Sequence, residues 1–141
     1  MTSQLDPQEV RLTADPRFAE AVRLFNDGQW YACHDGFEEL WHETAGPLRP
    51  VLQGILQLAV AQLHRERGNL RGATILTGEG LGRLQAAQAS GLGLDLAGLR
   101  NTARLWLGAL QEGGSLDGLP PLALHPAGEV GPGLDGGVDA L

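Results

Sequence analysis

The stretch from Pro50 to Leu63 restricts the possible folds more than any other part of the chain. It reads PVLQGILQLAVAQL and contains no charged side chain. A helix that is free of charge on all sides is typically either buried in the centre of a protein or spans a membrane. Spanning a membrane takes about 20 consecutive apolar residues, and this stretch is too short. We therefore expect a buried central helix that continues to about Arg67.

Four further segments show apolar residues at helical spacing, and Gly or Pro residues separate them. The predicted helices cover residues 16–25, 30–44, 70–89 and 94–111. No segment shows the alternation that is typical of a strand. The sequence therefore predicts an all-α fold, a compact bundle of about five helices with a buried central helix.

The helix predicted over residues 70–89 contains four glycines, at positions 72, 78, 80 and 82. Each glycine lowers intrinsic helix stability by about 1 kcal/mol relative to alanine. Such a helix persists only where tertiary packing holds it, for example where glycines let a neighbouring helix approach closely. We expect either this close packing or a bend near residues 78–82.

The chain has 141 residues, which is the length of a single domain. We expect an N-terminal lead-in over residues 1–15 and a helical-bundle domain over residues 16–111. Residues 112–141 are rich in Gly and Pro, contain no arginine and carry acidic side chains. This composition predicts a flexible acidic tail that is either disordered or draped over the bundle.

The net charge argues against a nucleic-acid partner, and the cysteine content indicates a reducing compartment. The formal net charge is −7, whereas binding to nucleic acid requires a basic surface. The single cysteine excludes an intramolecular disulfide and fits a reducing compartment. The first residues lack the basic and apolar regions of a signal peptide. We expect a cytoplasmic protein that binds neither nucleic acid nor a membrane; a protein partner and a homo-oligomer stay open as alternatives.

His34 lies on the apolar stripe of the helix predicted over residues 30–44. It shares that stripe with three aromatic residues at helical spacing: Trp30, Phe37 and Trp41. Glu38 follows His34 by one helical turn, at the edge of the stripe. A buried polar group that lacks a hydrogen-bond partner costs about 1–3 kcal/mol, so both side chains need partners. These two residues are therefore the first candidates for a functional site.

The central helix carries a matching line of residues at the same spacing: Gln53, Gln57, Val60 and His64. The short connection between the two helices predicts that they are antiparallel neighbours. In the expected register, Glu38 lies near Gln57, and His34 lies between Val60 and His64. The polar cluster predicted inside this helical hairpin consists of Trp30, His34, Glu38, Trp41, Gln53, Gln57 and His64.

Residue types alone leave several interpretations of this cluster open. The first is a structural hydrogen-bond network that fixes the register of the two helices. The second is a site for a single divalent metal ion, Fe, Mn or Zn, bound by His34, Glu38 and His64. The third is acid–base catalysis by His34, with Glu38 as its orienting partner.

A small polar ligand would occupy a pocket lined by side chains from both helices. The residues expected to line that pocket are Trp30, Trp41, Gln53 and Gln57. A function of a different class stays open beside it: a non-catalytic interaction module whose polar cluster is purely structural. The sequence does not specify the reaction, the ligand or the oligomeric state.

Two long spaced motifs follow each other between residues 18 and 85. The first is Phe25-Asn26-x-Gly28-x-Trp30-Tyr31-x-x-His34-Asp35-x-x-Glu38-x-x-Trp41. The second is Gln53-Gly54-Ile55-Leu56-Gln57-Leu58-Ala59-x-Ala61-x-x-His64, followed by Gly68-Asn69-x-x-Gly72-Ala73. Together they resemble the family catalogued as domain of unknown function 309, small all-helical proteins of bacteria, archaea and plastids. The family's usual His-Glu pair is His34-Asp35 here. The resemblance implies a compact all-α bundle and carries no assigned activity.

Overall fold

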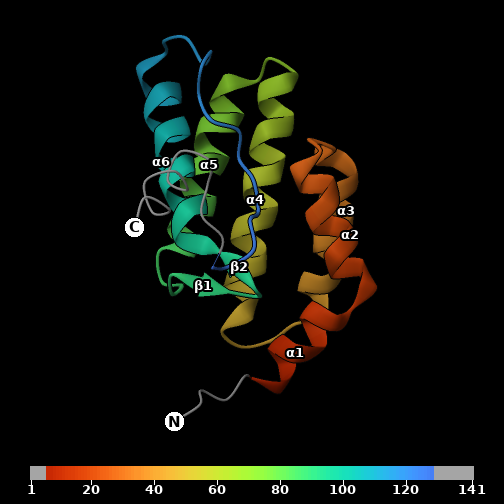
Figure 1. Cartoon of the computed structure of the whole chain (residues 1–141). Helices are drawn as coiled ribbons and strands as arrows, with labels where there is room; N and C mark the ends of the chain where they lie inside the picture. The colour runs from red at the N-terminus through yellow and green to blue at the C-terminus, as the bar shows by residue number, and fades with distance from the viewer. Residues whose placement is uncertain (1–5, 129–141) are drawn as a thin grey trace, which may run out of the picture.

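The computed structural model describes residues 6–128, which form six helices and one short β-hairpin (Figure 1). The helices are α1 (Pro7–Ala14), α2 (Pro16–Asn26), α3 (Trp30–His42), α4 (Leu48–Glu66), α5 (Leu70–Leu84) and α6 (Leu96–Glu112). The hairpin pairs β1 (Ser90–Gly91) antiparallel with β2 (Leu94–Asp95). The helical bundle is thus confirmed, while the sixth helix and the two-stranded sheet were not predicted.

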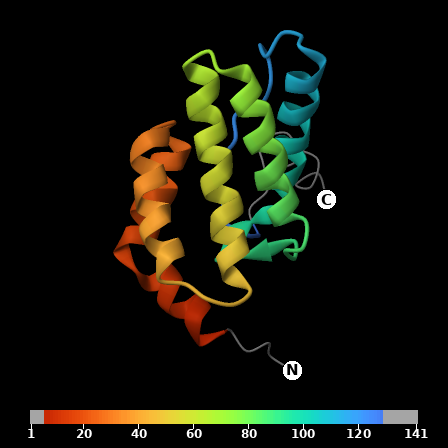
Figure 2. The same cartoon turned by 180° about the vertical axis from the view of Figure 1, so that it is seen from behind.

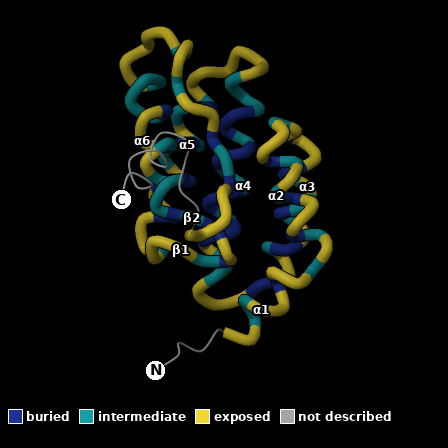
Figure 3. The backbone as a smooth tube through the Cα atoms, in the orientation of Figure 1, coloured by how far each residue is buried: buried dark blue, intermediate teal, exposed yellow. Residues whose placement is uncertain are grey.

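α4 is the central helix of the bundle, as the sequence predicts. It packs against α3 on one side and α5 on the other, and the three helices lie side by side in Figure 2. No residue from 51 to 65 is exposed, and the buried part of the backbone in Figure 3 is concentrated around this helix. Leu52, Ile55 and Leu58 are fully buried in the core. None of the described helices is long and apolar enough to cross a membrane.

The glycine-rich helix α5 persists without a break and ends at Leu84 rather than near residue 89. Of the two alternatives, close packing is the one that the structure adopts. Gly54 of α4 and Gly80 of α5 meet at the contact between the two helices. The absent side chains let the two backbones approach, and this packing compensates for the low intrinsic helix stability of the segment.

Helix α1 occupies most of the segment for which the sequence pattern indicated only a polar lead-in. The side chain of Asp6 accepts a hydrogen bond from the backbone N–H of Gln8, and Pro7 occupies the first turn. Leu12 is buried against the core. The same signal, an aspartate followed by proline, begins α2 at Asp15. The short length of α1, with one buried residue, made the apolar periodicity too weak to detect.

The β-hairpin depends on a turn that the sequence does not reveal. Leu92 and Gly93 both have positive φ, +57° and +71°, the backbone of a tight hairpin turn. Leucine rarely adopts this conformation. Here its side chain is buried in the core, and its backbone N–H donates to a carboxylate oxygen of Glu9. Burial and this hydrogen bond hold a strained residue in place.

Part of the predicted tail is ordered against the bundle. The segment that follows α6 extends along the molecule and is coloured blue in Figure 1. Leu122 and Leu124 from this segment are buried in the hydrophobic core. Residues 122–124 of the predicted tail therefore pack against the bundle. The rest of the predicted tail, residues 129–141, lies outside the described residues.

Candidate functional site

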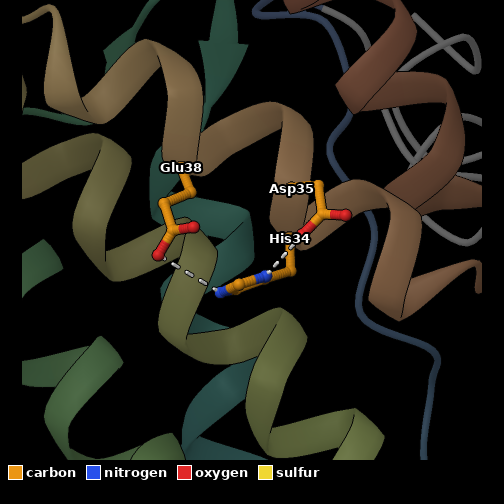
Figure 4. Close-up of side chains that lie close together, drawn as sticks. All are labelled: His34, Asp35 and Glu38. Atoms are coloured by element: carbon orange, nitrogen blue, oxygen red, sulfur yellow. Dashed lines mark hydrogen bonds and ion pairs between the residues drawn. The ribbon is translucent and has the colours of Figure 1, made fainter.

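His34, Asp35 and Glu38 belong to α3, and their side chains lie close together (Figure 4). The adjacent side of the helix is buried in the core and consists of Trp30, Cys33, Phe37 and Leu40. Gly28, whose φ is +75°, supplies the left-handed residue that ends α2 and lets the chain turn into α3. His34 and Glu38 are one helical turn apart, so their side chains lie next to each other.

The imidazole of His34 lies between two carboxylates. Its Nδ1 is 3.2 Å from Oδ1 of Asp35, and its Nε2 is 3.7 Å from Oε2 of Glu38. The side chain of His34 is 28% exposed, and those of Asp35 and Glu38 are 61% and 45% exposed. The group therefore lies at the surface of the bundle, whereas the sequence pattern predicts it inside the helical hairpin.

These three residues offer donor atoms that one metal ion could share. One ligand atom from each of them lies within 4.8 Å of the others. Imidazole nitrogen and carboxylate oxygen together suit first-row transition metals such as Zn, Mn and Fe. The structure thus brings His34 and Glu38 together, as expected from their spacing, and adds Asp35, which the sequence analysis named only within the family motif.

The remaining polar residues of the predicted cluster have other partners. His64 lies in the last turn of α4, where its Nδ1 is 3.1 Å from Nδ2 of Asn69. Gln57 faces α5: its Nε2 donates to Glu79 over 3.1 Å, and its Oε1 accepts from Nε of Arg83 over 3.0 Å. Gln57 therefore serves the contact with α5, and the described part of the structure does not bring His64 into the group around His34.

Two contacts fix the pairing of α3 with α4. At one end, Cζ of Arg49 lies 4.0 Å from the ring centroid of Trp41. At the other end, Nε1 of Trp30 donates to Oε2 of Glu66 over 3.0 Å. The two helices are therefore antiparallel, as predicted, and the tryptophans expected to line a pocket mark the two ends of their contact. Gln53, the fourth expected lining residue, is half-buried on α4.

A second charged cluster surrounds Arg17 where α2 meets α3. Its guanidinium lies 2.8 Å from Asp15, 2.7 Å from Glu43 and 3.3 Å from Glu39. Hydrogen bonds from Arg17 hold the pKa of the Asp15 and Glu43 carboxyls below their usual values. The same bonds raise the pKa of Arg17. With three carboxylates around one cation, this cluster is an ion-pair network that joins two helices. Glu39 and Glu43 are too far from Arg17 in sequence for spacing to reveal the contact.

Two surface cavities lie away from the group around His34. One, of about 240 Å³, adjoins the Arg17 cluster. The other, of about 310 Å³, lies between α1, the start of α4 and the hairpin, with Leu48, Val51 and Leu96 among its apolar walls. Neither of these two cavities is lined by a residue of the candidate metal group, whose side chains are accessible to solvent.

Comparison with known proteins supports the resemblance found in the two sequence motifs. A family model described as Domain of unknown function (DUF309) matches residues 18–76. The matched part contains α3 and α4 and therefore includes all residues of the group around His34. No curated protein matches the chain. The segment over residues 18–76 thus belongs to the family of domain of unknown function 309.

Proposed function

We propose that this protein binds a single divalent transition-metal ion at the surface of α3, through His34 and Glu38. The observation that carries the proposal is the position of the imidazole, which presents each of its two nitrogens to a different carboxylate. Nε2 and the carboxylate of Glu38 act as metal ligands. Asp35, on the Nδ1 side, orients the ring.

The distances favour this division of roles. The 3.2 Å separation between Nδ1 of His34 and Oδ1 of Asp35 is a hydrogen bond. The 3.7 Å separation between Nε2 and Oε2 of Glu38 is too long for one. Zinc lies about 2.0–2.2 Å from nitrogen and oxygen ligands, so two donors that share the ion lie roughly 3–3.5 Å apart. A small side-chain rotation would bring this pair to that spacing.

A carboxylate on the second ring nitrogen is the usual support of a metal-bound histidine. It fixes the tautomer, holds the ring in place and increases the basicity of the ligating nitrogen. Two protein ligands from one helix leave other coordination positions open to water or to a substrate. A bound water would become more acidic, which is the chemistry by which metal sites generate a nucleophile near neutral pH.

Surface exposure argues against a purely structural role for the group. A polar network that locks two helices together is buried, because burial is what makes an unpaired group costly. Here the partners of His34 come from its own helix, and all three side chains are accessible to solvent. Truncation of His34 should therefore leave the fold intact, which makes the metal proposal directly testable.

The test is calorimetric titration of chelator-treated protein with Zn²⁺, Mn²⁺ and Co²⁺. We expect one binding site per chain in the wild type, and loss of that site in His34→Ala and in Glu38→Gln. Asp35→Asn should bind about 10- to 100-fold more weakly, because an orienting partner has an effect of that size. His42→Ala is the matched control, since His42 is an exposed histidine of the same helix outside the group.

The outcome also decides the role of His64. If His64 supplies a third ligand after a rearrangement, His64→Ala will lose affinity as severely as His34→Ala. If the group of Figure 4 is the complete protein contribution, His64→Ala will bind as the wild type does. A wild-type chain that binds no metal, or a His34→Ala variant that binds with unchanged affinity, would overturn the proposed function.

A further inference from the structure

The segment over residues 119–127, called the strap below, is held in the manner of a bound peptide. Asn26, the last residue of α2, makes two hydrogen bonds to the backbone of Leu124. Its Nδ2 donates to the carbonyl oxygen over 3.0 Å, and its Oδ1 accepts from the N–H over 2.7 Å. A side-chain amide that pairs with both backbone groups of one residue recognises extended chain irrespective of sequence.

The strap also adds to the edge of the hairpin. The N–H of Asp95 donates to the carbonyl oxygen of His125 over 2.8 Å, and the N–H of Ala127 donates to that of Gly93 over 2.8 Å. Leu94 and Pro126 form an antiparallel bridge. Addition of an extended segment to a sheet edge is a common mode of peptide recognition, in which backbone hydrogen bonds provide affinity.

Specificity comes from two leucines with alternate spacing. Leu122 and Leu124 are 3% and 2% exposed, whereas Pro121 and His125 are exposed. This alternation is that of a strand with one buried face. Trp106 of α6 completes the attachment, because its Nε1 donates to the carbonyl oxygen of Pro120 over 2.8 Å.

The strap and the surface that binds it come from different parts of the chain. We name that surface the strap seat and define it by Asn26, the hairpin residues 93–95 and Trp106. Asn26 lies within the family-matched residues 18–76, whereas residues 93–95, Trp106 and the strap lie outside them. Between α6 and the strap, Gly113 has a φ of +71°, and residues 113–118 are exposed apart from Leu116. This linker is therefore exposed over most of its length, and Leu116 is its one residue that packs against the core.

We propose that the strap seat is a docking site for an extended segment with leucines two residues apart, and that a second copy of this chain supplies this segment in an assembly. Every group that recognises the strap contacts backbone atoms or one of two leucines, and the strap of another copy presents the same groups. Exchange of an identical element creates a dimer without new contacts. This inference rests on contacts that are independent of the metal group on α3.

A complementation experiment with full-length chains tests the proposal. In one variant, Leu122→Ser and Leu124→Ser disable the strap and leave the seat intact. In the other, Asn26→Asp replaces the amide donor by a carboxylate and weakens the seat, while the strap stays intact. The strap of the same chain competes with the strap of a second chain at an effective concentration near the millimolar range. Both defects are therefore needed: a weakened seat frees the intact strap of one chain, and a disabled strap leaves the seat of the other chain open.

We expect each variant alone to have the mass of one chain by light scattering, and their mixture to contain a species with the mass of two. A mixture of Asn26→Asp with a chain that carries all three substitutions is the matched control, because it contains no intact seat, and it should stay single-chain. If both variants are folded by circular dichroism and their mixture contains no two-chain species, the proposal is overturned.

If a variant does not fold, hydrogen exchange of the wild type shows whether the strap can leave the strap seat. The amides of Leu124 and Ala127 are bonded to the seat, and the amide of Leu58 lies inside α4. A strap that can leave its seat will show at least about tenfold lower protection at Leu124 and Ala127 than at Leu58, because its opening does not require global unfolding. Equal protection at all three amides would show that the strap is inseparable from the core and would overturn the proposal.

Discussion

Gly54 and Gly80 face each other across the contact between α4 and α5. A Cβ atom on Gly80 would lie 2.9 Å from the carbonyl oxygen of Gly54, and one on Gly54 would lie 3.0 Å from the carbonyl oxygen of Gly80. Both obstructing atoms belong to backbone, which cannot rotate away as a flexible side chain can. The two helices can therefore approach this closely only while both residues lack a side chain.

Gly80→Ala should lower the free energy of unfolding by about 1–3 kcal/mol, the usual effect of excess volume in a packed core. Gly82→Ala is the matched change in the same helix, where a Cβ would have no atom within 4 Å. It should raise the free energy of unfolding by about 0.5–1 kcal/mol, because alanine favours the helix. Urea denaturation measures both values. Equal effects at the two positions would contradict the conclusion that Gly80 lacks a side chain because the backbone of α4 approaches it closely.

Cys33 should be unreactive in the folded protein. Its side chain is fully buried, and burial raises the pKa of the thiol to about 12. Since the thiolate is the reactive form, a thiol reagent such as Ellman's reagent should label the native chain at pH 8 only as fast as it unfolds. Rapid and complete labelling in guanidinium chloride is the positive control. Equally rapid labelling of native protein would show that Cys33 is accessible.

The Arg17 cluster should make stability depend on pH in the acid range. The folded-state pKa values of Asp15 and Glu43 are lowered by Arg17. In the acid range the unfolded chain therefore binds more protons than the folded chain, and stability falls as pH decreases. The contribution is complete above the usual carboxyl pKa near 4 and is lost as the pH drops through the lowered values.

Arg17→Leu should therefore flatten the dependence of the melting temperature on pH below about pH 4–5. Arg104→Leu is the control, because Arg104 contacts the neutral side chains of Asn101 and Gln85. It should leave the slope of the acid limb unchanged. Thermal melts monitored by circular dichroism at a series of pH values provide the comparison. An Arg17→Leu slope as steep as that of the wild type would remove this cluster from the causes of acid sensitivity.

The three tryptophans should respond differently to replacement by phenylalanine. Nε1 of Trp30 donates to Glu66, and Nε1 of Trp106 donates to Pro120. The buried Nε1 of Trp41 has no partner among the described residues. Trp41→Phe should therefore cost less stability than the other two changes, by about 1 kcal/mol for the hydrogen bond that it does not lose. Denaturation curves of the three variants decide this, and an equal or larger loss for Trp41→Phe would contradict it.

The predictable parts of the fold are those that depend on local pattern. The charge-free stretch from Pro50 identifies the central helix, because a helix without charged side chains that is too short to span a membrane fits best in the centre of a bundle. The short connection after α3 predicts its antiparallel packing against α4. The hairpin was missed because its turn uses Leu92 at positive φ, where sequence rules expect asparagine or glycine. Burial of the Leu92 side chain imposes that conformation, and a local sequence pattern does not reveal which side chains are buried.

In the candidate site, too, contacts within one helix are predictable from the sequence, and contacts between helices are not. His34 and Glu38 are brought together by their spacing on one helix, and the sequence is sufficient to pair them. Gln57 was expected to join them, but it turns to Glu79 and Arg83 of α5 instead. A helix with neighbours on both sides can present a polar line to either, and spacing along one helix does not reveal which neighbour the side chains contact.

The turn at Leu92 and Gly93 receives both ends of the described chain. Glu9 accepts a hydrogen bond from Leu92, and Ala127 donates one to Gly93. The larger contacts between helices, by contrast, all join helices that follow each other along the chain. Local contacts form quickly, whereas distant ones carry the entropy cost of closing a long loop. We expect this junction to close after the rate-limiting step of folding. Interactions that form so late slow unfolding and leave the folding rate unchanged, so the junction governs how long the native state survives.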